Sequence, residues 1–195
     1  MIVGPPGVGK STLASELASR SGITNFELDE ILYKPDWRRV PHAEFRHAIN
    51  EIVEKSEWIV SGNYAGVRDL LWTNADVVVW LDLPLNLTLC RLVRRTLHRI
   101  LTREVVAGGN RETFKRVFSN QSIILWAMRS QKSMRKEYEQ TVKLYDRRVS
   151  VVRLRSGSAQ KKWTETVSAV ASDDLPSTIK RALRVSLTNE FGQTY

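Results

Sequence analysis

The chain has 195 residues, of which 42% are hydrophobic and 26% charged, as in an ordinary globular domain. No stretch reaches the about 18 apolar residues of a membrane span, and no secretory leader pattern is present, so we expect a cytoplasmic protein. The net charge of +9 is uneven: residues 1–90 carry 8 Lys/Arg against 12 Asp/Glu (−4), and residues 91–195 carry 22 against 9 (+13). This basic half predicts an anionic partner, and composition leaves nucleic acid, a membrane surface and a polyphosphate open.

The first predicted elements alternate between strand and helix. Residues 1–3 predict a buried strand. Strands usually have about five or six residues, so the native protein is open to a start upstream of Met1. Residues 11–20 space their leucines and alanines as a helix does. Residues 23–28 predict a second strand that ends at Asp29.

Residues 4–11 match the phosphate-loop pattern G-x-x-x-x-G-K-[ST] completely, between an apolar strand and an amphipathic helix. Such a loop turns successive backbone N–H groups toward an anion at the start of a helix. Lys10 then places a positive charge on the β- and γ-phosphates, and the Ser11 hydroxyl suits Mg²⁺. The nucleotide-binding residues predicted on this basis are Gly4, Gly7, Val8, Gly9, Lys10, Ser11 and Thr12.

The middle of the chain continues the alternation. Residues 42–55 predict an amphipathic helix, and residues 58–60 predict a strand. The strongest strand signal is at residues 77–81, ending at Asp82, and a helix is predicted from about 85 to 101. Cys90, in this helix, lies among leucines and is expected to be a buried, inert thiol.

The last part of the pattern is a turn at residues 105–110, a long helix at about 111–128 that continues with a bend to about Tyr145, and a strand at 149–154. Short strands between helices predict an α/β fold with three α/β/α layers around a parallel sheet. We predict one domain over residues 1–172. The tail, residues 173–195, has some helical spacing but stays unplaced.

The chain is short for a motor or helicase, and it lacks the N-K-x-D motif of small GTPases. Its motifs resemble those of the adenylate-kinase-like P-loop kinases, and even more those of bacterial DNA topology modulation proteins, over about residues 1–155. The segments that carry the resemblance are 4–13, 27–29, 34–37, 58–64, 79–84 and 91–95. The resemblance implies a P-loop NTPase fold with a five-stranded parallel sheet, a small helical lid at about 101–116, and kinase activity with ATP and Mg²⁺.

Basic side chains follow one face of the predicted helix 85–101, without an acidic residue among them. Phosphoryl transfer spreads negative charge that planar guanidinium groups neutralise. By resemblance to such kinases we assign this role to Arg91 and Arg95, and less firmly to Arg129 and Arg135. A merely basic surface helix is the alternative. The residues of this face are Arg91, Arg94, Arg95 and His98.

The metal site departs from the family pattern. Where those kinases have Asp-Gly after the third strand, this chain has Ser61-Gly62. Asp82 or Asp29 is expected to take over, and we assign the metal to Ser11 and Asp82. Either aspartate alternatively caps the helix that follows it.

The predicted function is transfer of a phosphoryl group from ATP to a small molecule: a nucleotide, nucleoside or similar metabolite. Lys10, Arg91 and Arg95 stabilise the transferred phosphate, and Asp29 orients or deprotonates the acceptor. Trp37, an aromatic among basic residues, is a candidate contact for a planar acceptor, with a core position as the alternative. The rival function is an ATP-binding regulator associated with DNA, with little or no turnover; nucleic acid is the less favoured partner.

A kinase must exclude water from the transferred phosphate, and closure of a lid does so. The paired glycines Gly108 and Gly109 give the segment 101–116 backbone freedom. We expect its clustered positive charges to keep it open, so that it is poorly ordered or displaced in an unliganded crystal.

Overall fold

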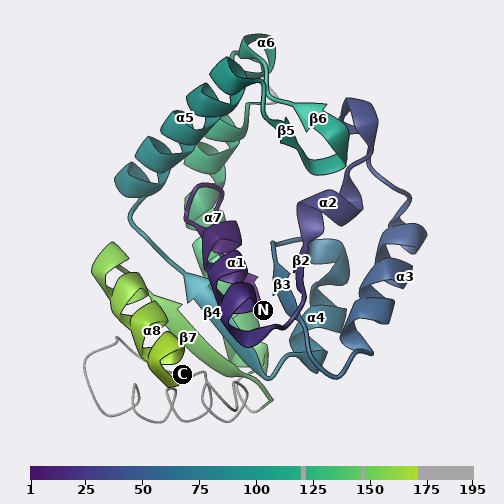
Figure 1. The fold of residues 1–195 in the computed structure, drawn as a ribbon, viewed down its shortest axis with the longest axis vertical. Helices are drawn as coiled ribbons and strands as arrows, with labels where there is room; N and C mark the ends of the chain where they lie inside the picture. The colour runs from purple at the N-terminus through teal and green to yellow at the C-terminus, as the bar shows by residue number, and fades with distance from the viewer. Residues whose placement is uncertain (120–121, 146–147, 171–195) are drawn as a thin grey trace.

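The computed structural model describes residues 1–119, 122–145 and 148–170 and contains a parallel sheet of five strands in the order β2-β3-β1-β4-β7 (Figure 1). This confirms the predicted α/β fold with its five-stranded parallel sheet. The longest strands, β4 and β7, are rich in valine, as expected of strands covered on both faces. The strands are β1 Ile2–Val3, β2 Asn25–Glu27, β3 Ile59–Ser61, β4 Val77–Leu81 and β7 Ser150–Leu154.

Helices cover both faces of this sheet. On one face, α1 (Lys10–Ser21) and α8 (Gly157–Val170) pack on β1, β4 and β7 through a core that includes Leu13, Leu17 and Trp163. On the other face lie α3 (His42–Val53), α4 (Arg68–Asn74) and α7 (Ile123–Tyr145). Helices α4 and α8 were not predicted, because the first is short and the second has a weak apolar period; a helix at the position of α2 was considered only as an alternative role for Asp29.

The segment predicted as a turn, residues 105–110, lies after α5 (Leu85–Thr102) in an antiparallel hairpin of β5 (Val105–Val106) and β6 (Asn110–Arg111). The long helix predicted from about residue 111 does not begin there, because the one-turn helix α6 (Phe114–Val117) comes first. Helix α7 begins only at Ile123. The lid is therefore mainly a hairpin rather than helical, because an isolated run of apolar residues at helical spacing does not by itself specify a helix.

Two further expectations can be compared with the described residues. Cys90 is exposed on α5, so the expectation of a buried thiol was wrong. No described helix is long and apolar enough to cross a membrane. The predicted tail, residues 173–195, lies outside the described residues.

Candidate functional site

The phosphate loop, residues 4–9, joins the end of β1 to the start of α1. Gly4, Gly7 and Gly9 have φ angles of 146°, 78° and 100°, which side chains rarely allow. A Cβ added at Gly7 would lie 2.8 Å from both the Leu92 Cβ and the Thr88 carbonyl oxygen. The loop thus packs closely against α5, and its glycines are required by backbone angle and by space. Ser11 and Thr12 follow on the exposed first turn of α1.

The Lys10 side chain is half-buried in this loop, and its Nζ donates to the Pro5 carbonyl oxygen at 3.1 Å. Burial lowers the Lys10 pKa to about 8, which nearby Asp29 partly opposes and Arg95 reinforces. Lys10, Asp29 and Arg95 come from three separate segments of the chain. The fold thus brings together three of the four predicted catalytic residues.

Asp29 was predicted to end a strand. In the structure it lies instead in the first turn of the short helix α2 (Leu28–Leu32). The Tyr64 hydroxyl donates a 2.6 Å hydrogen bond to its Oδ1. Burial, followed by the Asp29 charge, raises the pKa of Tyr64 well above its usual range, so the phenol stays protonated and keeps donating. Tyr64 therefore orients the Asp29 carboxylate. Its place after β3 was part of the resemblance, but nothing in the sequence assigned it a role.

Helix α5 presents its arginines differently from the predicted pattern. Arg91 Nη1 donates to the Val8 carbonyl oxygen at 3.4 Å, so this side chain does reach the phosphate loop. Arg95 is half-buried, and its Nε is buried without a hydrogen-bond partner among the described residues. By contrast, the predicted apolar residues Val93 and Leu97 are 37% and 45% exposed. The inner face of α5 thus includes Arg95, with a donor available for a ligand.

The two predicted metal ligands, Ser11 and Asp82, do not lie in one site. Ser11 Oγ donates to Glu27 Oε2 at 2.9 Å, beside Lys10 and Asp29. Hydroxyl and carboxylate oxygens are what Mg²⁺ prefers, and the phosphates of a nucleotide complete such a site. The described residues contain no group of three or more His, Cys, Asp or Glu side chains arranged to hold a metal. Ser11 with Glu27 fits Mg²⁺; Glu27 was not predicted.

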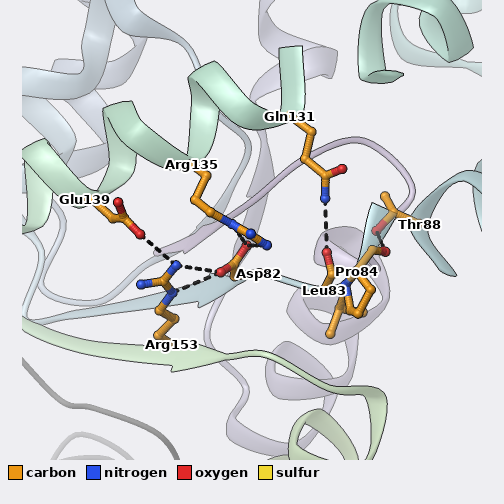
Figure 2. A network of polar contacts seen from close by, with 8 residues as sticks. All are labelled: Asp82, Leu83, Pro84, Thr88, Gln131, Arg135, Glu139 and Arg153. Carbon is orange, nitrogen blue, oxygen red and sulfur yellow. Dashed lines mark hydrogen bonds and ion pairs between the residues drawn. The ribbon is translucent and has the colours of Figure 1, made fainter. Parts of the chain in front are cut away.

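Asp82 does not fit the predicted metal role, because arginines occupy both of its oxygens (Figure 2). Arg135 Nε donates to Oδ1 at 2.9 Å, and Arg153 donates to Oδ2 through Nε at 3.0 Å and Nη2 at 2.7 Å. Arg153 Nη2 also donates to Glu139 at 3.0 Å. Asp82 joins β4 to β7 and α7, and Arg135 belongs to this network rather than to the phosphate site. Arg129, the other arginine assigned less firmly, is exposed on α7.

The hairpin of the lid is fixed to the segment after α2. The Asn110 side chain is buried; its Oδ1 accepts from the Trp37 backbone N–H at 2.8 Å, and its Nδ2 donates to the carbonyl oxygens of Lys34 (2.9 Å) and Ala107 (2.7 Å). Figure 1 shows the hairpin lying between the far ends of α5 and α2, opposite the start of α1. The sequence did not reveal this contact, and the expected displacement of the segment in an unliganded crystal stays a prediction.

The sequence analysis did not predict that the start of α8 lies beside the phosphate loop. A Cβ added at Gly9 would lie 3.4 Å from Gln160 Nε2, and one added at Gly157 would lie 3.6 Å from Arg91 Nη2. The start of α8 therefore adjoins Arg91 and the loop. The segment 156–160 has no motif, so only the sheet order, which places β7 beside β4, reveals this position.

Comparisons with known proteins agree with this geometry. The sequence model of the ATPase family associated with various cellular activities (AAA) matches residues 1–62, which include the whole phosphate loop. Uncharacterized protein YqaC of Bacillus subtilis (strain 168) is 31% identical over 119 residues. The aligned part is 60% of this chain and 66% of YqaC, so the chain spans just under two thirds of that relative.

The glycine loop at the end of β1, the parallel sheet and the match over residues 1–62 decide the fold. This chain has a P-loop NTPase fold. The comparisons do not address the finer resemblance to adenylate-kinase-like kinases or to topology modulation proteins, which stays a prediction for this chain.

The lowered Lys10 pKa makes a prediction about pH. A bound polyphosphate favours the charged amine and raises its pKa, so affinity is full below about pH 8 and falls as pH rises through that value. At pH 8, calorimetry of ADP binding in buffers of different ionisation enthalpy should show proton uptake. Lys10→Arg stays charged across this range and should show none. Equal affinity at pH 7 and pH 9 in the unmodified protein would contradict this.

Proposed function

We propose that this P-loop NTPase is an ATP-dependent phosphotransferase that acts on a small molecule such as a nucleotide or nucleoside. The observation that carries the proposal is the convergence of Lys10, Asp29 and Arg95. A protein that only senses a nucleotide has less need of an oriented carboxylate near the loop lysine, which could accept a proton from the attacking oxygen. The Tyr64 hydrogen bond gives Asp29 that orientation.

In the proposed reaction an acceptor hydroxyl oxygen bonds to the γ-phosphorus of ATP while the bond to the β–γ bridging oxygen breaks. ADP leaves, and the hydroxyl proton passes to the Asp29 carboxylate. Lys10 neutralises charge on the phosphate oxygens, and Arg95 offers guanidinium donors to the transferred group. Mg²⁺, when held through Ser11 and Glu27, supplies further charge neutralisation. The hairpin and α5 keep water away from the reacting atoms.

Asp29→Asn tests the role of the carboxylate. Removing the base is expected to lower the rate of phosphoryl transfer by about 100-fold or more, since general-base catalysis contributes about 10²–10⁴-fold. Binding of ADP should be little changed, because the loop is intact. The matched control is Glu30→Gln, which changes the neighbouring exposed carboxylate on the same helix. If both variants slow transfer equally, Asp29 is not the base.

A regulator associated with DNA is the rival function, and the observation that favours it is the +13 charge of residues 91–195. Part of that charge faces the nucleotide site through Arg91 and Arg95. A salt titration of duplex DNA binding separates the two functions. Tight binding with a steep salt dependence supports the regulator, and negligible binding at physiological salt supports the phosphotransferase.

A further inference from the structure

The helix that carries the proposed base is too short to hold its own position. Helix α2 has five residues, and isolated helices shorter than about 12–15 residues are marginal in water. Tertiary contacts therefore set where α2 lies. Leu28 and Leu32 anchor it in the core, and Tyr64 holds the Asp29 carboxylate. A further contact comes from the β5–β6 hairpin, which packs against α2 (Figure 1).

The hairpin meets the end of α2 backbone to backbone. Its turn is η3 (Ala107–Gly109), and a Cβ added at Gly108 would collide with the Tyr33 carbonyl oxygen. Tyr33 directly follows α2, and its N–H donates to the Asp29 carbonyl oxygen at 3.0 Å. The residue that the hairpin touches is thus hydrogen-bonded to the proposed base.

Asn110 fixes this contact through the loop that follows α2. Its buried side chain donates to the Lys34 carbonyl oxygen at 2.9 Å and accepts from the Trp37 N–H at 2.8 Å. The loop is closed on itself, because the Lys34 N–H donates to the Arg38 carbonyl oxygen at 2.8 Å. Trp37 has a φ angle of 57°, a strained backbone that persists only where the surrounding structure imposes it. The hairpin and this loop are therefore fastened to each other.

We propose that the β5–β6 hairpin, through Gly108 and Asn110, positions Asp29 for proton transfer. This inference rests on the proposed function. A base accepts a proton only from within about 2.6–3.2 Å, and a misplacement of about 1 Å can cost about 100-fold in rate. Tyr64 sets the direction of the carboxylate, and the hairpin sets the place of the helix that carries it. Gly108 and Asn110 are positioning residues, since they act through α2.

The first test compares two adjacent glycines. Gly108 and Gly109 have φ angles of 67° and 76°, so alanine strains the backbone at either position. At Gly108 the added Cβ presses on Tyr33, whereas at Gly109 no described atom lies within 4 Å of it. Gly108→Ala should speed hydrogen exchange of the Tyr33 amide by about tenfold or more, and Gly109→Ala should leave it within about twofold.

The second test measures transfer of label from γ-³²P-labelled ATP to a pool of nucleosides, nucleotides and sugar phosphates. Gly108→Ala and Asn110→Ala should lower kcat by about tenfold or more and leave the KM for ATP within about twofold, because the phosphate loop is intact. The stoichiometry of ADP binding, measured by calorimetry, corrects kcat for the folded fraction. The controls are Gly109→Ala and Asn74→Ala; Asn74 is exposed and donates to the Leu70 carbonyl oxygen.

Equal Tyr33 exchange in the Gly108→Ala and Gly109→Ala proteins would overturn the inference. So would faster exchange with an unchanged kcat per ADP-binding site, because the contact would then be structural only. If Asn110→Ala does not fold, the two glycine variants decide.

Failure of the proposed function looks different. The unmodified protein then transfers label to none of the pools, whatever the exchange of Tyr33. That result refutes the phosphotransferase and with it the role of the hairpin in proton transfer. The exchange measurement needs neither ligand nor turnover, so it still shows whether the hairpin holds the end of α2.

Discussion

Lys10→Ala should lower kcat/KM for ATP turnover by about 100-fold or more, equivalent to about 2.7 kcal/mol of transition-state stabilisation. The reason is local: this half-buried amine lies where the charges of Asp29 and Arg95 act on it, in an environment less solvated than bulk water. Apart from the hydrogen bond to Pro5, the structure gives its Nζ no other hydrogen-bond partner among the described residues. The charge is therefore held for a ligand.

The matched control is Arg94→Ala, which removes a cation from an exposed position on α5. Its turnover should stay within about twofold of the unmodified protein, because surface charges in water act weakly. Circular dichroism establishes that both variants are folded. If the Lys10→Ala protein is folded and its turnover is unchanged, the phosphate loop does not take part in catalysis.

Asp82→Ala is expected to lower the free energy of unfolding by about 3–5 kcal/mol, the cost of leaving a buried ion pair without one partner. Asp82 and Arg153 are 6% and 5% exposed, and Arg153 also lies 3.9 Å from the centre of the Trp80 ring. Among the described residues, Glu139 is the carboxylate that remains paired with Arg153. Denaturant unfolding measures the difference.

The control for this variant is Asp69→Ala, which breaks an Asp–Arg pair on the surface. Asp69 forms two 2.8 Å hydrogen bonds with Arg46, so the geometry is as good, but the Asp69 side chain is 57% exposed. The decrease in the free energy of unfolding should be much smaller for Asp69→Ala, since water replaces the lost contacts. A similar loss in both variants would contradict the structural role of Asp82.

The sequence predicted the sheet and the phosphate loop because both are encoded locally. The phosphate-loop pattern predicts the conformation of residues 4–11. The valine-rich runs of β4 and β7 predict that these strands are buried. Asp82 was misassigned because its partners Arg135 and Arg153 lie 53 and 71 residues away in the chain. A strand-end aspartate looks the same in sequence whether it meets a metal or two arginines.

The lid was mispredicted for a related reason. Residues 111–128 contain enough apolar side chains at helical spacing to suggest a helix, but Asn110 holds β6 against the segment after α2. That contact spans 73 to 76 residues, and nothing in the local pattern reveals it. Likewise, Tyr64 and Glu27 gain roles only once the fold places them beside Asp29 and Ser11.

The most direct test of the proposed function follows the γ-phosphoryl group itself. The protein is incubated with γ-³²P-labelled ATP, Mg²⁺ and separate pools of nucleosides, nucleotides and sugar phosphates, and the products are separated by chromatography. We predict that label moves to a small molecule in one pool, with one ADP formed per labelled product. Release of the label only as inorganic phosphate, at the same rate with every pool, would contradict phosphoryl transfer to a small molecule.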